Sequence, residues 1–310
     1  MSRRNRKKVT TQDKISGDDL INKNNNANVY DVIYYIHDMD KNEIIPFYLK
    51  LDEIDEHPEI IKIDEPEPEP EPEPRIGPYD RLVQTVVTQI TSTNDKDILD
   101  YLKYGYYINL QERVDRKQNV IDAFKKLNIP SLNVLRMDAR KHQYGAIGCY
   151  LSHIYCLYKA REFGYDHILI CEDDVQFKNI NVLKVQLRRV LKNIKNWDVI
   201  MLASNVLTAE KIIGVNYCVR VTSGMAATCY IVKSHYYDTL LNNFREGINH
   251  LFKHPELANQ YAVDVYWNIL QKKDNWIIPL PLSVTQYPNF SNIENRHVNY
   301  DNCMLKKIIL

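Results

Sequence analysis

The sequence lacks an excess of either charge and has no long apolar run. Lys and Arg number 40 and Asp and Glu number 40 among 310 residues, so the formal net charge is zero. Without an overall field, nothing attracts nucleic acid or an anionic membrane surface. No apolar stretch approaches the roughly 20 residues that a membrane helix requires. We therefore expect no nucleic-acid partner and no membrane span.

Cysteine is sparse, and no two cysteines form a CxxC pair. Scattered cysteines in apolar surroundings are typical of reduced, buried thiols, and these spacings do not predict a zinc site. The basic residues 2–8 are followed by no apolar h-region, and residues 306–310 are not an ER-retention signal. We therefore expect a cytoplasmic protein without a signal peptide. The cysteines are Cys149, Cys156, Cys171, Cys218, Cys229 and Cys303.

The first 78 residues differ in composition from the rest. Residues 1–26 are polar, rich in Asn and Lys and aperiodic, which predicts a disordered tail. Residues 27–64 hold two β-branched and aromatic runs around 38–42, which predicts a small β-hairpin module. Residues 65–78 begin with five Glu-Pro units. Because proline cannot continue a helix or a ladder and like charges repel, this segment is expected to be a semi-rigid linker.

Residues 79–310 alternate strand-like with helix-like patterns. This β-α alternation predicts an α/β domain, a mostly parallel sheet with helices on both faces. In such sheets, ligands lie beyond the carboxyl ends of the strands. Strands are expected at 105–110, 132–139, 168–171 and 197–204, and helices at 116–127, 145–164 and 182–195.

Three adjacent carboxylates, Glu172, Asp173 and Asp174, follow the strand expected at 168–171. Because side chains alternate in extended backbone, Glu172 and Asp174 are expected on one face and Asp173 on the other. Two carboxylates on one face suit a hard divalent cation with oxygen ligands. A helix N-cap formed by Asp173 or Asp174 would explain the motif equally well. Taken alone, these residues leave both interpretations open.

Polar side chains also follow the two preceding strands. Asn109, Arg113 and Arg116 come after the first, where an amide can bind a base or ribose and a guanidinium can pair with phosphate. Alternatively, the two arginines are solvated residues that open a helix. Asp138 ends the second strand and could accept a hydrogen bond from a ribose hydroxyl or cap the next turn.

Four ordered blocks of the sequence resemble glycosyltransferase family 25, which includes bacterial lipooligosaccharide galactosyltransferases and procollagen galactosyltransferases. Weaker similarities follow, so that the resemblance extends over about 104–297. The amino-acid usage of the chain also resembles that of homologues from giant viruses. For a viral protein, the host cytoplasm or the virion would be the expected location. The blocks are 108–116, 145–153, 170–175 and 197–202, and the weaker similarities lie at 222–241, Asp264 and 283–293.

The resemblance implies a GT-A fold, which is Rossmann-like, and a UDP-sugar donor such as UDP-galactose or UDP-glucose. It also implies Mn²⁺, or another divalent cation, held by the acidic motif. Asp174 would be the principal metal ligand, Glu172 would contact ribose or assist the metal, and Asp173 would position the donor-binding loop. His297 is a candidate late metal ligand, with a plain surface histidine as the alternative. The remaining candidate donor contacts are Asn109, Arg113, Arg116 and Asp138.

Inverting transfer requires a base for the acceptor hydroxyl, and Asp264 is the candidate. The neighbouring aromatics Tyr261, Tyr266 and Trp267 could form a platform on which a sugar stacks. The alternative is a helix-face carboxylate beside core aromatics. Ser152 and His153 lie in an expected helix and are interpreted as a buried pair with satisfied hydrogen bonds that orients the acidic loop, not as a nucleophile and its base.

These features lead to one functional hypothesis and one alternative. The first is a metal-dependent hexosyltransferase of the family 25 type, which moves galactose or glucose from a UDP-sugar to a hydroxyl-bearing acceptor, a protein or a glycan. The alternative is a non-catalytic, degenerate GT-A binding or scaffold protein. It is motivated by the N-terminal region and by Asn292, which stands in a Ser-Asn-Ile sequence where family members often have an acidic residue.

Overall fold

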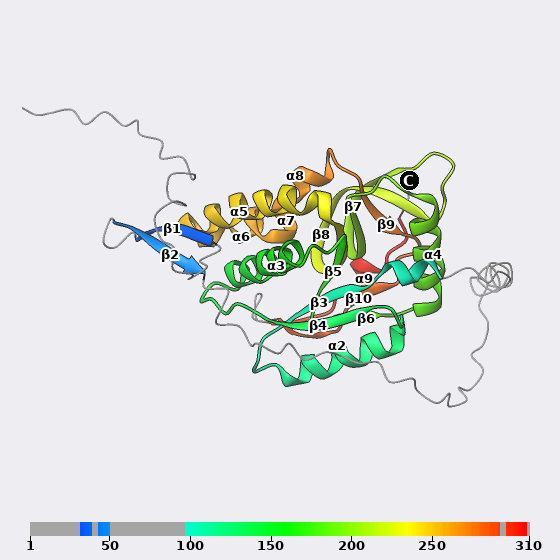
Figure 1. Cartoon of the computed structure of the whole chain (residues 1–310), viewed down its shortest axis with the longest axis horizontal. Coiled ribbons are helices and arrows are strands. Elements are labelled where there is room, and N and C mark those ends of the chain that lie inside the picture. Colours follow the sequence, from blue (N-terminus) through cyan, green and yellow to red (C-terminus); the bar gives the residue numbers. More distant parts are fainter. Residues whose placement is uncertain (1–31, 39–42, 50–96, 292–295, 309–310) are drawn as a thin grey trace, which may run out of the picture. The chain divides into compact units, whose positions relative to one another are not determined.

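The structure is a computed structural model that describes residues 32–38, 43–49, 97–291 and 296–308 (Figure 1). The chain divides into two compact units, residues 1–55 and 56–310. In the first, β1 (Val32–Asp38) pairs with β2 (Glu43–Leu49) in antiparallel register, at the place where the sequence predicts a hairpin. The predicted tail and Glu-Pro linker lie outside the described residues, and the predicted domain limits stay predictions.

A six-stranded sheet forms the centre of the second unit, in the order β4-β3-β5-β8-β7-β9. β3 is parallel to β4 and β5, β7 is parallel to β9, and β8 alone runs against its neighbours. The predicted α/β class with a mostly parallel sheet is therefore confirmed. The strands are β3 (Tyr104–Asn109), β4 (Asn133–Asp138), β5 (His167–Glu172), β7 (Val199–Lys211), β8 (Cys218–Lys233) and β9 (Trp276–Pro279).

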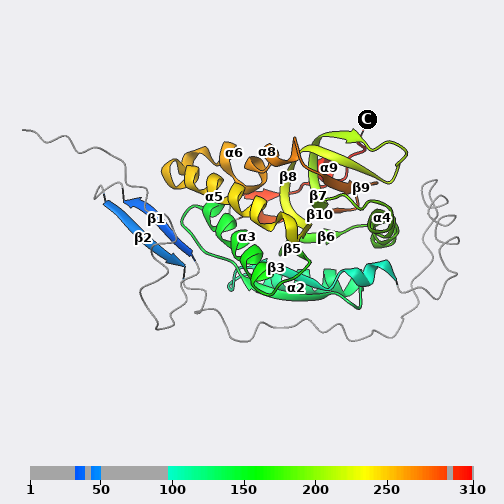
Figure 2. The same cartoon turned by 45° about the horizontal axis from the view of Figure 1, so that its top comes forward.

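Helices cover both faces of this sheet (Figures 1 and 2). Leu169 and Cys171 of β5 share a buried core with residues of α2 and α4, whereas the alternate residues Ile168 and Ile170 face the side of α3. Helix α5 packs against α3 on that side. None of the helices in the described ranges is long and apolar enough to cross a membrane. The longer helices are α2 (Val114–Leu127), α3 (Gly145–Glu162), α4 (Ile180–Asn193) and α5 (Tyr237–Lys253).

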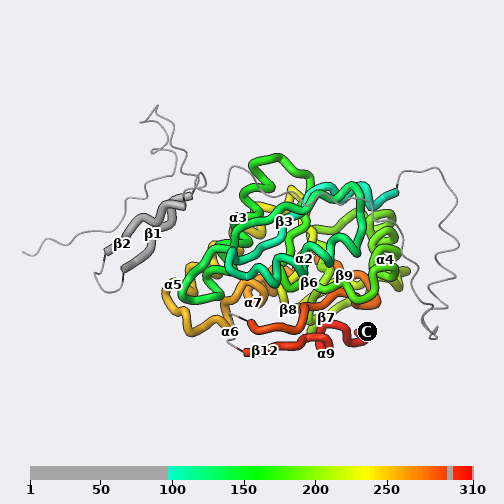
Figure 3. The backbone as a smooth tube through the Cα atoms, turned by 90° about the horizontal axis from the view of Figure 1, so that it is seen from below, coloured from blue at the N-terminus to red at the C-terminus, as the bar shows by residue number. Residues whose placement is uncertain are grey.

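Short elements complete the unit and return the chain end to the acidic motif. β6 (Val175–Phe177) pairs antiparallel with β10 (Val284–Gln286), so the C-terminal segment lies beside the residues that follow β5 (Figure 3). The hairpin of β11 (Asn289–Ser291) and β12 (Arg296–Val298) follows. The remaining short helices are η2 (Ile98–Tyr101), η3 (Ser234–Tyr236), η4 (Pro255–Leu257), α6 (Ala258–Tyr261), α7 (Val263–Tyr266), α8 (Asn268–Gln271) and α9 (Asp301–Met304).

Candidate functional site

The acidic motif lies where the sheet rule places a ligand site, at the carboxyl end of β5. Glu172 is the last residue of β5, Asp173 and Asp174 form a turn, and β6 begins directly after them. The expected alternation therefore ends at Glu172, because the backbone is no longer extended beyond it. The N-cap alternative is wrong, since the next helix, α4, is capped by Asn179, whose Oδ1 accepts from the Val182 amide at 3.1 Å.

Arg116 of α2 connects the motif to the C-terminal hairpin. Its Nη1 lies 3.0 Å from Asp173 Oδ1 and 3.3 Å from Asp174 Oδ2. Its Nη2 donates to the Phe290 carbonyl at 2.8 Å. Arg116, which the sequence predicts to contact the sugar-nucleotide donor, thus also partly neutralises two of the three carboxylates.

Burial makes the charge on this turn costly. It raises the pKa of Asp174 to about 8, with the charge of Glu172 adding to the effect and Arg116 opposing it. Burial likewise raises the pKa of Asp173. Moreover, Asp174 Oδ1 is buried and has no hydrogen-bond partner among the described residues. An unpartnered carboxylate oxygen beside further carboxylates fits a hard divalent cation, which prefers oxygen ligands.

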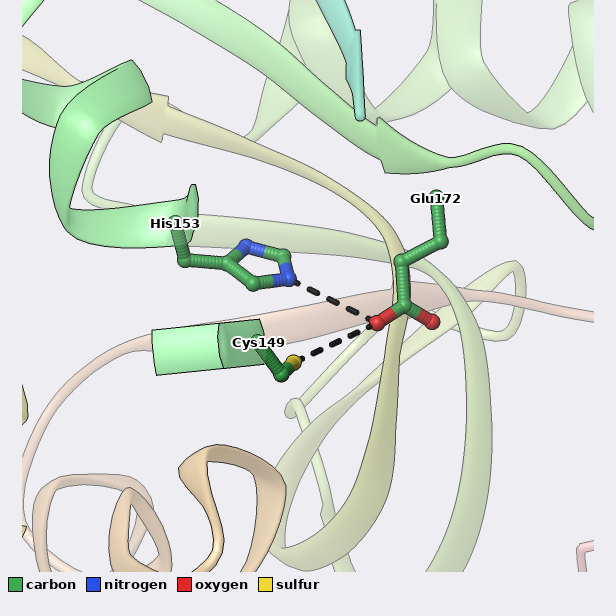
Figure 4. A group of neighbouring side chains, drawn as sticks. All are labelled: Cys149, His153 and Glu172. Carbon is green, nitrogen blue, oxygen red and sulfur yellow. Dashed lines mark hydrogen bonds and ion pairs between the residues drawn. The ribbon is translucent and has the colours of Figure 1, made fainter. Parts of the chain in front are cut away.

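Glu172 faces a different group of side chains, on α3 (Figure 4). Cys149 Sγ donates to Glu172 Oε1 at 3.6 Å, and His153 Nε2 lies 3.6 Å from the same oxygen. Burial acts to raise the pKa of Glu172, but His153 and Cys149 outweigh it and lower that pKa. The three ligand atoms all lie within 4.8 Å of one another, so that the group could hold a metal ion. The sequence interpretation missed this group because it considered only the spacing between cysteines, although Cys149 and His153 are one helical turn apart.

The other predicted donor contacts follow the neighbouring strands β3 and β4, and each interacts with another side chain of the protein. Asn109 is only 1 % exposed; its Nδ2 donates to Asp173 Oδ2 at 2.7 Å and its Oδ1 accepts from Arg136. Asn109 therefore positions Asp173. Arg113 pairs with Asp115, and Asp138, at the end of β4, pairs with Arg136. Contact of these residues with a nucleotide stays a prediction.

Asp264 lies in α7, with its Oδ2 accepting from the Ala226 amide at 2.9 Å. Burial raises its pKa, and the charge of Glu172 raises it further, which places Asp264 near the acidic motif. Trp267 cannot belong to the expected sugar platform, because it is fully buried and its Nε1 donates to the Gly224 carbonyl. Tyr261 is half-buried and stacks on His250, 4.3 Å between ring centroids.

Two further expectations concern α3 and β12. Ser152 and His153 are both buried, as expected, and Ser152 Oγ accepts from the Arg140 amide. The expectation that both are satisfied is wrong for His153, because its Nε2 has no hydrogen-bond partner among the described residues. His297 is exposed on β12, opposite Phe290, whose carbonyl accepts from Arg116. Its role as a late metal ligand stays a prediction. Asn292, the departure from the family pattern, lies outside the described residues.

Comparison with solved structures gives only distant likenesses. A mannose-1-phosphate geranyltransferase from Thermus thermophilus is 9% identical, with 58% of this chain and 73% of that chain covered and a TM-score of 0.35. A197 from STIV is 12% identical, with 67% and 97% covered and a TM-score of 0.33. A glycosyltransferase involved in the glycosylation of the major capsid of PBCV-1 is 8% identical, with 58% and 92% covered and a TM-score of 0.33. Scores this low carry no argument about function.

Sequence comparison is more specific. No curated protein sequence matches the chain. Residues 137–213, however, match the family model of glycosyltransferase family 25 (LPS biosynthesis protein). This segment runs from the end of β4 into β7 and includes α3 and the acidic motif. The resemblance to family 25 is therefore confirmed over the residues that the family model matches, 137–213.

Proposed function

We propose that this protein is a divalent-metal-dependent hexosyltransferase, which moves galactose or glucose from a UDP-sugar to a hydroxyl of a protein or glycan. One observation carries the proposal. Asp174 stands at the carboxyl end of β5, inside the family 25 segment, with a buried Oδ1 that has no hydrogen-bond partner among the described residues. A carboxylate so placed offers an oxygen that a hard cation can bind.

The residues of the turn would hold the cation and the donor. Asp174 is the principal ligand of Mn²⁺ or a similar ion, with Glu172 as a ribose or metal contact and His297 as a late ligand. When bound, the cation neutralises charge that develops on the diphosphate leaving group. Arg116 and Asn109 hold Asp173, and thereby the turn, in place. Arg113 and Asp138 are the remaining candidate contacts to the nucleotide.

Asp264 is the proposed base. Its pKa is raised, and a carboxylate of raised pKa is better matched to accepting a proton from a hydroxyl near neutral pH. With Oδ2 held by the Ala226 amide, the proton of the acceptor hydroxyl would pass to Oδ1. Tyr261 at the end of α6 and Tyr266 at the end of α7 are half-buried and are the remaining candidates for the sugar platform.

The test is a panel of UDP-sugars assayed for hydrolysis and transfer with and without Mn²⁺. We expect turnover of one UDP-hexose that requires the metal, and loss of both turnover and metal dependence in Asp174→Ala. Asp238→Ala is the control, because Asp238 is exposed and pairs with Arg161 at the surface. Full activity of Asp174→Ala would refute the metal assignment.

The alternative function is a non-catalytic GT-A scaffold, favoured by Asn292 in place of the acidic residue that the family often has. Calorimetry with UDP and Mn²⁺ distinguishes the two. Heat of binding for UDP that depends on Mn²⁺ supports the transferase, and no binding at millimolar UDP supports the scaffold.

A further inference from the structure

Cys149, His153 and Glu172 converge from two elements on one point. Cys149 and His153 project from successive turns of α3, and Glu172 ends β5 (Figure 4). Glu172 Oε1 lies 3.6 Å from both Cys149 Sγ and His153 Nε2. The other carboxylate oxygen points away from both side chains (Figure 4).

These separations are those of metal ligands. Around a tetrahedral zinc ion, with Zn–S of about 2.3 Å and Zn–N or Zn–O of about 2.0–2.1 Å, neighbouring ligand atoms lie about 3.4–3.7 Å apart. The two separations of 3.6 Å fall in that range. A nitrogen–oxygen hydrogen bond would be shorter, about 2.7–3.2 Å. His153 Nε2 and Glu172 Oε1 are therefore farther apart than in a hydrogen bond and are suitably spaced to share an ion.

His153 supplies a second, independent observation. It is 0 % exposed, and its Nε2 has no hydrogen-bond partner among the described residues. Leaving a buried polar atom without a partner is costly. Its Nδ1 lies 3.0 Å from the Tyr230 hydroxyl. Metal-binding histidines commonly have such a partner on the opposite ring nitrogen, which fixes the tautomer and turns the free nitrogen toward the metal.

We propose that Cys149, His153 and Glu172 form a second metal site, which binds a thiophilic divalent cation of the Zn²⁺ class. A thiolate and an imidazole select such an ion, whereas Mn²⁺ prefers the all-oxygen surroundings at Asp174. Binding deprotonates Cys149 and releases the proton to solvent. Three protein ligands leave a fourth position for water.

An ion at this site would connect α3 to the end of β5. Glu172 would bind it through Oε1 and leave its other oxygen for the donor side of the motif. The site is additional to the proposed hexosyl transfer, because two of its ligands, Cys149 and His153 on α3, have no part in that transfer and the third, Glu172, would bind the ion through Oε1 alone.

The experiment uses the full chain, freed of metal by a chelator and titrated with Co²⁺ and then Zn²⁺. We expect one Co²⁺ per chain with thiolate-to-cobalt charge-transfer absorption, which Zn²⁺ abolishes by displacement. Cys149→Ser should remove the absorption and weaken Zn²⁺ binding more than about 100-fold, since a lost ligand costs more than a lost outer partner. Cys303→Ser is the matched control, a half-buried cysteine outside the group, and should behave as the wild type.

Three other variants make the outcome decisive. Asp174→Ala should keep the thiolate absorption, because Asp174 belongs to the other site. Tyr230→Phe should keep it with about 10-fold weaker Zn²⁺ binding. Glu172→Gln, which is nearly isosteric, should keep the thiolate absorption with at least about 10-fold weaker Zn²⁺ binding. This variant replaces Cys149→Ser as the test if circular dichroism shows that Cys149→Ser misfolds. No thiolate absorption in the wild type, its persistence in folded Cys149→Ser, or unchanged affinity in Glu172→Gln would each overturn the proposal. Because the probe is the metal alone, these results are independent of any UDP-sugar activity.

Discussion

Arg116 and Asp173 form an ion pair, 3.0 Å between Nη1 and Oδ1, although they are 57 residues apart in the sequence. The pair connects the first turn of α2 to the end of β5. Because the same guanidinium also contacts Asp174 and the Phe290 carbonyl, three segments of the chain meet at one positive charge. The acidic turn thus depends on Arg116 whenever no other cation is present.

Arg116→Ala should therefore destabilise the metal-free protein. Removing one partner of a largely buried ion pair leaves carboxylates uncompensated, and we expect a loss of about 2–3 kcal/mol in the free energy of unfolding. Excess Mn²⁺ should recover part of this loss by supplying positive charge. Urea unfolding with and without Mn²⁺ measures both effects.

Arg188→Ala is the matched control for this measurement. Arg188 pairs with Asp97, but both side chains are more exposed, 28% and 41%. An ion pair of this kind contributes less than about 1 kcal/mol. Equal losses for the two arginine variants would contradict the special role of Arg116.

Gly148→Ala should destabilise the protein even though alanine is the better helix former. A Cβ at Gly148 would lie 2.4 Å from the Arg140 carbonyl oxygen, a backbone atom that cannot turn aside. Helix α3 or the segment after β4 must shift, at a cost of about 1–3 kcal/mol. Thermal unfolding measures the change. Ala146→Gly, two residues earlier in the same helix, should cost only about 1 kcal/mol, from helix propensity alone.

Much of the sheet could be predicted from the sequence, because its strands are short apolar runs that end at polar residues. β3, β4 and β5 lie within a residue or two of their expected positions. The long β7–β8 pair could not be predicted, since β7 continues to Lys211, beyond the apolar run expected at 197–204. The outer residues of β7 are largely exposed, so burial imposes no pattern on them.

The position of the acidic motif could be predicted from the sequence, but its contacts could not. The carboxyl end of β5 follows from the sheet rule, whereas the partners of the motif depend on pairings between distant residues. Asn109 resembles a ligand contact in the sequence, yet its amide is used by Asp173, 64 residues away. The direction of Glu172 toward α3 follows the alternation of Ile168 and Ile170 along β5, whereas the positions of Asp173 and Asp174 depend on a turn that alternation does not anticipate.

His167, at the start of β5, predicts how stability depends on pH. Burial lowers the pKa of His167 to about 4, and its ring stacks on Tyr101. Between pH 6.5 and 4 the unfolded chain therefore binds a proton that the folded chain does not, so stability falls as the pH falls through this window. The contribution reaches up to about 3 kcal/mol.

His167→Phe removes this titration and keeps an aromatic ring against Tyr101. The free energy of unfolding of the variant, compared with that of the wild type at pH 7 and pH 4, should lose less on acidification. His235→Phe is the control, because His235 is exposed and pairs with Asp198 at the surface. An equal pH dependence of the wild type and His167→Phe would show that the folded protein binds the proton as readily as the unfolded chain.

Asp264→Asn tests the proposed base at the atom that would take the proton. The amide oxygen can still accept from the Ala226 amide, so the local backbone contact is preserved and the variant should fold. Loss of a general base should lower kcat by about 10²–10⁴-fold, with little change in the KM for the donor, because the role proposed for Asp264 is toward the acceptor and not the donor. Hydrolysis of the donor by water should fall less than transfer does, since water requires less precise alignment than an acceptor hydroxyl. Steady-state assays of both reactions on the same preparation separate the two effects. A variant that transfers as fast as the wild type would leave Asp264 a structural carboxylate that holds the Ala226 amide.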